Sequence, residues 1–537
     1  MSKNRRSPLG PLTVAMGLSL LLGFGVARAL NARDDLRSQL DLFSQVLYLV
    51  QNHYVDPPDN EKIMKGAIDG MLKTLDPHTQ FLPTQRAQQM DEQFHGEYSG
   101  IGVQFDIIDN KIVVVAPLEG TPSYRLGIRA GDRIVEIDGK PLKANLANDD
   151  VLKALRGPDG STVAVTIERT DEPEPLHYTI QRAKIPIESI PYAYMIRPGV
   201  GYVRVIRFAQ TTGDELETAI TKLKAQGMKS LLLDLRSNTG GLLSQAVDVL
   251  DQLVPESKKL VYTRGRIPSA NADYYSTGRA GKWTDGPLVV LIDHGSASAS
   301  EIVAGAVQDL DRGLVVGLNS FGKGLVQNQL NMSEGKLLLT VARYYTPSGR
   351  SIQRPYDKGL EEYQVEAFQE DVPSDSALQA RPKHKTGAGR TVYGGGGIYP
   401  DVPIKEPENL TRAEIDMLNK RVFFEFSTAY VSKHKNTKWT ADSFSREKFT
   451  MTDADWANLR GVMDVRKVVA SDSTFQAEKP FMLRQVRADL ASATLGSLAR
   501  YRIAIEDDAQ LNTALEMFPQ AQKLMSSAIE TQKNSAR

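Results

Sequence analysis

One stretch, residues 293–327, constrains the fold of this chain more than any other. It reads DHGSASASEIVAGAVQDLDRGLVVGLNSFGKGLVQ. It contains a segment of helical periodicity, and apolar runs lie on both sides of its lysine, Lys323. A helix is expected to begin near Ala299, because apolar residues recur at helical spacing after it. These residues are Ile302, Val303, Ala306, Val307 and Leu310. The pattern predicts a buried helix between strands, as in an α/β core.

The same stretch holds a serine and a lysine that can form a hydrolytic pair. Ser298 stands at the expected helix start, Lys323 lies between two glycines, and Gln327 follows it by four positions. A serine needs a base to take its proton, and a lysine can be that base only when its amine is neutral. Burial favours the neutral amine, and the runs beside Lys323 are apolar. On a strand, Gln327 would share the face of Lys323 and could orient the amine.

Both residues also have ordinary structural interpretations. Ser298 to Glu301 matches a capping box, in which a serine only satisfies free backbone N–H groups. Lys323 alone reads equally well as a surface lysine in a glycine-rich turn. A Ser-His-Asp triad with His294 and Asp293 is disfavoured, because adjacent side chains diverge and triad members come from distant segments.

A second segment has the pattern of a strand that breaks into a glycine turn before a helix. It reads LLLDLRSNTGG over residues 231–241, and paired glycines let backbone N–H groups approach a ligand closely. Together with SASASE at 296–301 and FGKGLVQ at 321–327, it resembles the C-terminal processing peptidases, also called tail-specific proteases. The order of the three motifs and the spacing from serine to lysine fit that family.

The resemblance implies a fold and a set of roles. It implies a crotonase-like or ClpP-like α/β protease core with an inserted PDZ domain. Ser298 would be the nucleophile, Lys323 the general base and Gln327 the partner that positions the lysine. The oxyanion would be bound by backbone N–H groups at Gly240 or Gly241 and at Ala299.

A separate module is predicted over residues 96–183. LGIRAGDRIVEIDGK at 126–140 resembles the central signature of PDZ domains, with a helix expected at 149–155 and a last strand at 162–169. Such a domain pairs an extended peptide with a sheet edge and holds its terminal carboxylate with backbone N–H groups. Arg156 matches an arginine that the family resemblance suggests couples this domain to the active site. The expected carboxylate loop consists of Ser99, Gly100, Ile101 and Gly102.

Composition excludes several classes of protein. With 537 residues, 41% hydrophobic and 24% charged, the chain can bury more than one core. Basic and acidic residues are equal at 65 each, so nothing indicates nucleic-acid binding. The chain has no cysteine, which excludes disulfides and thiolate chemistry, and its histidines lack metal-ligand spacing. We expect neither a metal nor a cofactor.

The N-terminus predicts export. Lys3, Arg5 and Arg6 precede an apolar run at 12–27 that resembles a Sec-type signal. The run is short for a bilayer span of about 20 residues, and ARA at 27–29 is a fair cleavage site. We expect a periplasmic or extracytoplasmic protein, and two outcomes stay open: signal cleavage, or anchoring to the inner membrane.

The predicted fold class is multidomain α/β. The polar stretch from Gln353 to Gly394 is expected to be loop-like. The C-terminal part is either an appendage on the core or a surface for a homo-oligomer or an adaptor. The expected parts are a signal peptide or anchor at 1–30, a helical segment at 31–95, a PDZ domain at 96–183, a serine protease core at 184–405 and a helical extension at 406–537.

Two functions from different classes follow. The first is an exported serine endopeptidase that recognises protein or peptide substrates by their free C-termini and cleaves through an acyl-enzyme. The second is a PDZ-bearing scaffold that keeps a protease fold without turnover. Intact Ser298, Lys323 and Gln327 favour the enzyme. A crotonase-like acyl-transfer enzyme is a weaker third interpretation, which the PDZ module and the export signal disfavour.

Overall fold

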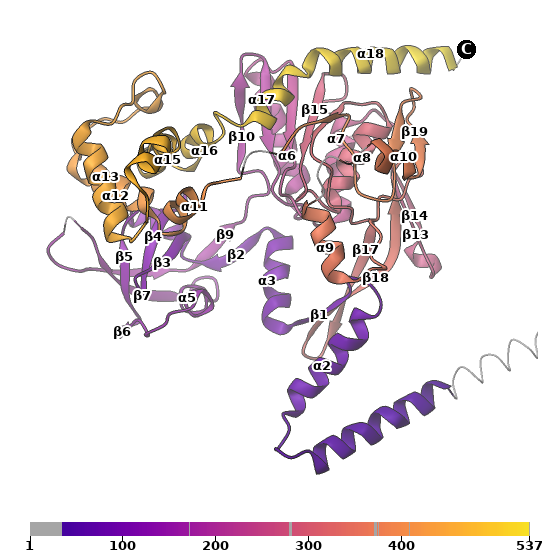
Figure 1. The fold of residues 1–537 in the computed structure, drawn as a ribbon, viewed down its shortest axis with the longest axis horizontal. Coiled ribbons are helices and arrows are strands. Elements are labelled where there is room, and N and C mark those ends of the chain that lie inside the picture. The colour runs from indigo at the N-terminus through magenta and orange to yellow at the C-terminus, as the bar shows by residue number, and fades with distance from the viewer. Residues whose placement is uncertain are drawn as a thin grey trace, which may run out of the picture. The chain divides into compact units, whose positions relative to one another are not determined.

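The computed structural model describes residues 35–535 apart from 171, 279–281, 370–372, 374 and 407–408. The predicted export signal therefore lies outside the described residues. In the part of the chain that is described, no helix has the length and apolar character to span a bilayer. By contacts between residues, the chain divides into two compact units, residues 1–81 and 82–537 (Figure 1).

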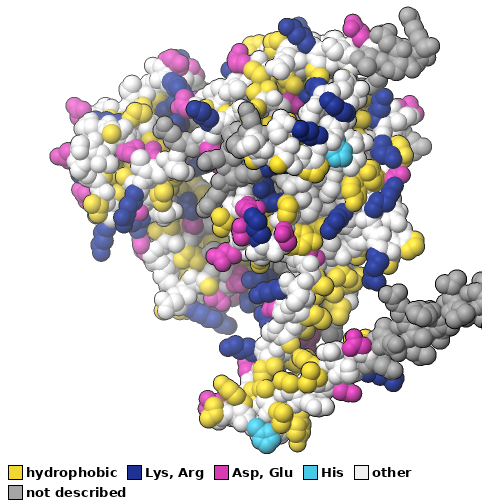
Figure 2. All heavy atoms as spheres, turned by 45° about the vertical axis from the view of Figure 1, so that its right-hand side comes forward, with side chains coloured by type: hydrophobic (Ala, Val, Ile, Leu, Met, Phe, Trp, Pro, Cys, Tyr) yellow, Lys and Arg dark blue, Asp and Glu magenta, His cyan; other side chains and the backbone are white. Residues whose placement is uncertain are grey.

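The first unit is mainly helical where it is described. One helix covers residues 35–53, and α2 covers Asn60–Lys73. The Asp59 carboxylate caps α2 by accepting the backbone N–H of Lys62 at 3.0 Å. Hydrophobic side chains gather on the surface of this unit (Figure 2). Those of the first helix that are exposed include Leu36, Leu40, Phe43, Val46 and Leu49.

The predicted PDZ module is present in the second unit. Its sheet has the strand order β3-β4-β5-β7-β8, with β6 on β5, and a separate ribbon pairs β2 with β9. The strand predicted at 162–169 is present at 162–168. The prediction that it is the last strand of the module is wrong, because β8 follows and pairs with it. The elements are β2 (Glu97–Gly100), β3 (Val103–Ile108), β4 (Lys111–Pro117), α4 (Pro122–Arg125), β5 (Arg133–Ile137), β6 (Lys140–Pro141), α5 (Asn148–Leu155), β7 (Thr162–Glu168), β8 (Leu176–Gln181) and β9 (Ala183–Pro186).

A mostly parallel sheet forms the centre of the predicted protease core. Its strand order is β10-β11-β12-β15-β16-β21, and only the β10–β11 pair is antiparallel. Strands buried on both faces are expected to be continuously apolar, as β15 is throughout. The elements are β10 (Tyr192–Arg197), β11 (Val200–Arg204), α6 (Thr212–Ala225), β12 (Ser230–Asp234), α7 (Leu243–Leu253), β15 (Leu288–Ile292), α8 (Ala299–Asp309), β16 (Leu314–Gly317) and β21 (Val402–Pro403).

The two faces of this sheet are covered by different parts of the chain. Successive side chains of a strand point to opposite faces, so Leu231 and Leu233 join the apolar cluster of α6, α7 and α8. Leu232 joins a second cluster, formed with α17 (Ala509–Glu516) and α18 (Phe518–Ser535). The last helices of the chain therefore complete the core of the protease sheet (Figure 1).

A second sheet carries the segment that follows Lys323. In it β18 pairs antiparallel with β17 and with β13, and β14 pairs with β13. The turn from β17 to β18 lies at Met332–Gly335. The strands are β13 (Lys259–Gly265), β14 (Ala272–Tyr275), β17 (Leu325–Met332) and β18 (Gly335–Tyr345).

The stretch from Gln353 to Gly394 is not loop-like, so that prediction is wrong. It contains two helices and a small hairpin, and Tyr363 packs its ring edge-on against Phe321 at 5.5 Å between centroids. Its helices are hard to predict because α9 buries little beyond Tyr363 and Ala367. The elements are α9 (Leu360–Gln369), α10 (Asp375–Ala380), β19 (Lys383–Lys385) and β20 (Thr391–Tyr393).

The C-terminal part is helical, and most of it has a core of its own. That core includes Phe423, Phe426, Leu459, Met482 and Leu490. The helices that contribute to it are α11 (Arg412–Asn419), α12 (Val422–Lys433), α13 (Asp453–Val465), α14 (Asp472–Ala477), α15 (Lys479–Leu495) and α16 (Ser497–Ala504).

Candidate active site

Ser298 stands at the turn between β15 and α8 in a strained conformation. Its φ of 54° is in the left-handed region, which residues other than glycine rarely adopt. Its side chain is half-buried, and α8 begins at Ala299, as predicted. The N-terminus of a helix carries partial positive charge. Ser298 is thus placed where negative charge that develops on a substrate would be stabilised.

The Glu301 carboxylate joins the serine segment to the lysine segment. Its Oε2 accepts the backbone N–H of Ser298 at 2.8 Å and that of Lys323 at 2.9 Å. Its Oε1 accepts the Gly322 N–H at 2.7 Å and the Ser320 hydroxyl at 2.5 Å. Burial raises the pKa of Glu301, although these hydrogen bonds oppose the shift. One buried carboxylate therefore fixes the candidate nucleophile and base relative to each other.

The Tyr344 hydroxyl holds the same two residues through their carbonyl groups. Its single proton is shared between the carbonyl oxygen of Lys323 at 2.8 Å and that of Ser298 at 3.1 Å. Burial raises the pKa of Tyr344 well above its usual value, and the nearby Glu301 charge adds to the shift, so the hydroxyl stays protonated. Ser298 and Lys323 are thus tied on both sides of their backbones.

Lys323 and Gln327 lie together as predicted, but for a different reason. The Lys323 Nζ donates to the Gln327 amide oxygen at 3.0 Å. Lys323 precedes β17, however, and the register of β17 shifts between Val326 and Gln327. Simple strand alternation therefore does not explain why Lys323 and Gln327 lie on the same side. The register shift turns the Gln327 side chain toward Lys323. An amide oxygen at this position can orient the amine without adding a negative charge.

The glycine turn that follows β12 lies directly against the serine. Gly240 has a φ of +100°, and a Cβ atom built on it would lie 2.8 Å from the Ser298 Cβ and 3.0 Å from the Ala299 nitrogen. Only glycine fits this approach. The Gly240 N–H donates to the Asn238 side chain at 2.9 Å in this structure. An oxyanion bound at Gly240 would have to replace that acceptor, whereas Gly241 and Ala299 keep their predicted roles as proposals.

His294 and Asp293 are turned to other partners. The His294 Nδ1 lies 2.8 Å from the Asn319 carbonyl oxygen, and its Nε2 lies 3.0 Å from Glu406. Asp293 accepts the Ser237 backbone N–H at 2.6 Å and the Ser237 hydroxyl at 3.0 Å. Asp293 therefore supports the glycine turn, in agreement with the argument against a Ser-His-Asp triad.

The predicted carboxylate loop of the PDZ module spans the end of a strand and a turn. Ser99 and Gly100 belong to β2 and pair with β9, whereas Ile101 and Gly102 form the turn before β3. A Cβ atom on Gly102 would lie 2.3 Å from Thr121, and its φ is +79°, so the turn requires glycine.

Arg156 lies at the same end of the module. Its guanidinium forms an ion pair with Glu92 of α3 (Thr84–His95) and lies 4.5 Å from the centroid of the Tyr98 ring. These residues line a cavity of about 900 Å³ that also reaches Ser99 and Leu152 of α5. Arg156 thus links α3 to the predicted carboxylate loop.

Two residues of this site have roles that sequence reasoning missed. Glu301 has a sequence signal, but the capping box explains it fully without a link to Lys323. Tyr344 has no local signal, because β18 brings it to the site through space. Among the described residues, no group of three or more His, Asp or Glu side chains could hold a metal ion.

Comparison with known proteins places these features in one family. Residues 199–362 match the model of peptidase family S41, residues 113–169 that of PDZ domains, and residues 25–86 that of the activating protease CtpB N-terminal domain. The chain is 36% identical over 402 residues to the carboxy-terminal-processing protease of Bartonella bacilliformis, a match that covers 72% of this chain and 91% of that protein.

Two further proteins are similar to this chain. The chain is 34% identical over 342 residues to the carboxy-terminal processing protease CtpB of Bacillus subtilis, with 62% of this chain and 68% of that one covered. Among solved structures, it is similar to the photosystem II D1 C-terminal processing protease, with 28% identity, a TM-score of 0.35, and coverage of 68% and 86%. This chain therefore belongs to the carboxy-terminal processing proteases, serine-type peptidases of family S41 that carry a PDZ domain.

Proposed function

We propose that this chain is an exported endopeptidase that cleaves with a Ser298–Lys323 dyad and selects substrates by their C-termini. The observation that carries the proposal is the shared support of the two residues by Glu301 and Tyr344. A residue that only caps a helix would not require hydrogen bonds to the segment of Lys323, which is distant in sequence. The apolar run at 12–27 supports export to the periplasm or another extracytoplasmic space, and the parallel sheet is compatible with a crotonase-like or ClpP-like core.

The reaction proceeds in two halves. The Ser298 Oγ attacks the scissile carbonyl carbon while the neutral Lys323 amine takes the hydroxyl proton. The tetrahedral intermediate collapses to an ester on Ser298, and the Lys323 ammonium returns the proton to the leaving amine. Water then attacks the ester, gives one proton to Lys323, and releases the new carboxyl end as the proton returns to Ser298. Gln327 keeps the amine oriented throughout.

Backbone N–H groups stabilise the negative charge of the intermediate. We assign this role to Ala299 at the start of α8 and to Gly240 or Gly241 in the facing turn. The two backbones are adjacent, because a Cβ atom built on Gly240 would lie 3.0 Å from the Ala299 nitrogen. Preorganised donors of this kind lower the barrier because they need no rearrangement as charge develops.

The PDZ module binds the free C-terminus of the substrate. The carboxylate is held by backbone N–H groups of the turn at Ile101 and Gly102, next to Ser99 and Gly100. Arg156 reports its occupancy to the rest of the enzyme through the contact with α3. A peptide amide would bind less tightly than the free acid, since it lacks the charge that this turn captures.

A fluorophosphonate probe tests the dyad in the full-length protein. The wild type should be labelled on the peptide that contains Ser298 and should hydrolyse peptide substrates. Lys323→Ala should abolish hydrolysis with an intact fold, and the Ser298→Ala, Lys323→Ala double variant should be no worse than either single one. Substantial turnover by Lys323→Ala would exclude the dyad. Binding of C-terminal peptides without labelling would favour the scaffold function instead.

A further inference from the structure

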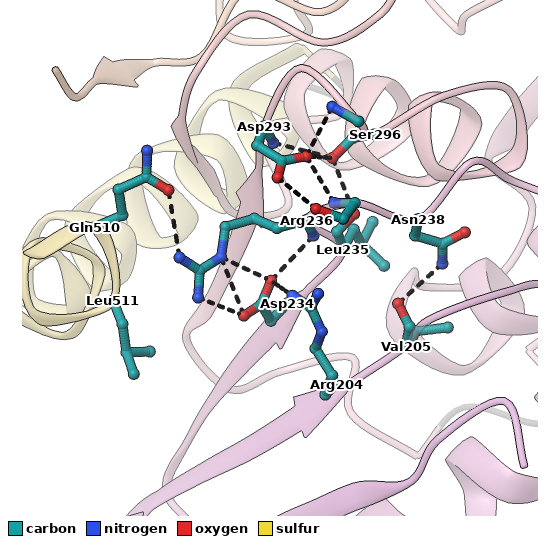
Figure 3. A network of polar contacts seen from close by, with 12 residues as sticks. Arg204, Val205, Asp234, Leu235, Arg236, Asn238, Asp293, Ser296, Gln510 and Leu511 are labelled. Atoms are coloured by element: carbon teal, nitrogen blue, oxygen red, sulfur yellow. Dashed lines mark hydrogen bonds and ion pairs between the residues drawn. The ribbon is translucent and has the colours of Figure 1, made fainter. Parts of the chain in front are cut away.

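The strand that leads into the glycine turn ends in a buried carboxylate. Asp234, the last residue of β12, is fully buried and accepts the Tyr202 hydroxyl at 2.8 Å and the Arg204 guanidinium at 2.5 Å. Burial alone would raise the pKa of Asp234, but the charges of Arg236 and Arg204 hold it below its usual value. This carboxylate is therefore the ionised centre of a buried network (Figure 3).

Arg236 connects this network to the C-terminal part of the chain. Its guanidinium contacts Asp234 at 2.8 Å and reaches the Asp508 carboxylate at 2.7 Å and the Gln510 amide oxygen at 3.3 Å. Asp508 is the residue before α17, and its side chain also caps that helix by accepting the Leu511 N–H at 2.9 Å. Figure 3 shows Arg236 between Asp234 and the helix that carries Gln510.

A tyrosine pair makes a second connection. The hydroxyl groups of Tyr202 and Tyr501 lie 2.6 Å apart, so Tyr501 of α16 adds to the group that surrounds Asp234. The Tyr501 ring also stacks on Tyr192 of β10, with 3.8 Å between the ring centroids. Tyr501, Asp508 and Gln510 thus approach the end of β12 from one short C-terminal segment.

Residues 237–241 form a short turn that follows Arg236 and faces Ser298, and hydrogen bonds hold its backbone. Ser237 has a φ of 54° and donates its N–H to Asp293 at 2.6 Å. Asn238 is fully buried, and its carbonyl oxygen accepts the Ala297 N–H at 3.0 Å beside the nucleophile. Its side chain accepts the N–H of Gly240, where a Cβ atom would lie 2.8 Å from the Ser298 Cβ. These contacts connect the residues that follow Arg236 to the backbone that faces the serine.

We propose that the segment Tyr501–Gln510 positions the glycine turn of the active site, and that the ion pair between Arg236 and Asp508 is the contact that sets its place. The inference rests on the proposed function, because it assigns that turn to oxyanion binding. Asp508 and Arg236 act through Gly240 and Gly241 and touch no substrate. Misplacing a reacting group by about 1 Å can cost on the order of 100-fold in rate, so a small movement of this turn is sufficient.

The test separates the ion pair from the helix cap that Asp508 also provides. Asp508→Ser keeps a good N-cap residue but cannot reach Arg236. Glu516→Gln is the matched control, since Glu516 also joins α17 to an arginine of the sheet, Arg197, through an exposed pair at 2.8 Å. We expect kcat/KM of Asp508→Ser to fall about 10- to 100-fold, mainly in kcat, with Glu516→Gln within about twofold of the wild type.

Two further measurements exclude a merely structural effect. The affinity for a peptide boronate, which forms a tetrahedral adduct, should fall in Asp508→Ser by the same factor as kcat/KM. Fluorophosphonate titration should still label one serine in every Asp508→Ser molecule, but more slowly. Fewer labelled molecules at an unchanged rate per labelled site would show simple unfolding and would overturn the proposal. So would wild-type kinetics in Asp508→Ser.

Hydrogen exchange keeps this test distinct from that of the dyad. Amides of residues 237–241 should exchange faster in Asp508→Ser than in the wild type or Glu516→Gln. If the wild-type protein is not labelled at Ser298, the proposed function fails, yet the exchange data still decide whether the C-terminal segment holds the turn. Unchanged exchange at 237–241 would refute the positioning role whatever the activity.

Discussion

At the scale of single residues, Glu301 shows how a carboxylate can organise a site without taking part in the chemistry. It accepts four hydrogen bonds, two on each oxygen, from both segments that carry the candidate dyad. A carboxylate suits such a site because it accepts hydrogen bonds at both oxygens, whereas an amide accepts at only one. A change of Glu301 to glutamine therefore separates its role in joining the two segments from its role in capping α8.

Glu301→Gln should reduce kcat/KM by at least about 100-fold. Whichever oxygen the amide nitrogen replaces, at least one backbone N–H would face another donor, at a cost of roughly 1–3 kcal/mol in stability. Steady-state kinetics and chemical denaturation measure both effects. A capping box accepts Glu or Gln equally, so Glu414→Gln in the capping box of α11 is the control. It should leave both kcat/KM and stability unchanged. Normal activity in Glu301→Gln would reduce Glu301 to a helix cap.

Asp234 predicts a pH dependence of stability. Its folded pKa lies below the unfolded value, so the stabilisation is present above the unfolded pKa and is lost as pH falls through the folded one. The stability difference between the wild type and Asp234→Asn should therefore be largest near neutral pH and shrink in acid. Denaturation midpoints of both proteins across this range check it. A difference that stays constant with pH would contradict the assignment of an ionised Asp234.

At the scale of elements, α3 and the β2–β9 ribbon surround Arg156. The ion pair with Glu92 and the contact with Tyr98 hold the guanidinium at the end of α5, beside the predicted carboxylate turn. Both partners are only partly exposed. Arg156 is therefore placed between the element that would bind a C-terminus and a helix that leads out of the module.

Arg156→Ala should lower proteolysis of a substrate with a free apolar C-terminus several-fold and leave the binding of its C-terminal peptide nearly unchanged. Binding is measured in full-length protein that also carries Ser298→Ala, so that the peptide is not cleaved. Lys184→Ala is the matched control, because Lys184 makes an exposed ion pair with Glu97 on the same ribbon. Equal proteolysis by wild type and Arg156→Ala would leave Arg156 a structural residue.

Elements with strong local signals could be predicted from the sequence. Apolar spacing and glycine punctuation indicate β12, α7 and the start of α8, and the structure confirms all three. β8 and α9 could not be predicted in the same way, because α9 buries only a thin apolar stripe and, in β8, Ile180 alone is fully buried. Contacts such as those of Tyr344 and Asp508 depend on segments that meet only after folding and leave no local pattern.

At the scale of the whole molecule, the C-terminal helices divide into two roles. Those from α11 to α16 have their own core, whereas α17 and α18 cover a face of the protease sheet. The sequence predicts only helices there and cannot tell the two groups apart, since both are amphipathic. The sheet is therefore complete only when the end of the chain has been added.

Leu515→Asp tests the role of α17. Leu515 is 7% exposed against the sheet, so a buried charge there should cost about 2–5 kcal/mol in stability. Leu498→Asp is the control, because Leu498 on α16 is 39% exposed and its change should stay within about 0.5 kcal/mol. Thermal unfolding and the solubility of both variants provide the measurement. If the two variants were equally stable, the packing of α17 against the sheet would contribute little to the stability of the protein.

The pairing of β2 with β9 has a consequence for how this chain can be altered. The two strands enter and leave the PDZ module side by side, with Ser99 opposite Lys184 and Gly100 opposite Ala183. A segment whose ends already meet can be exchanged for another with little strain on its host. We therefore expect the protease sheet to accept a recognition module of different specificity at this junction. Under the proposed function, such a transplantation would change substrate choice and keep the chemistry proposed for Ser298.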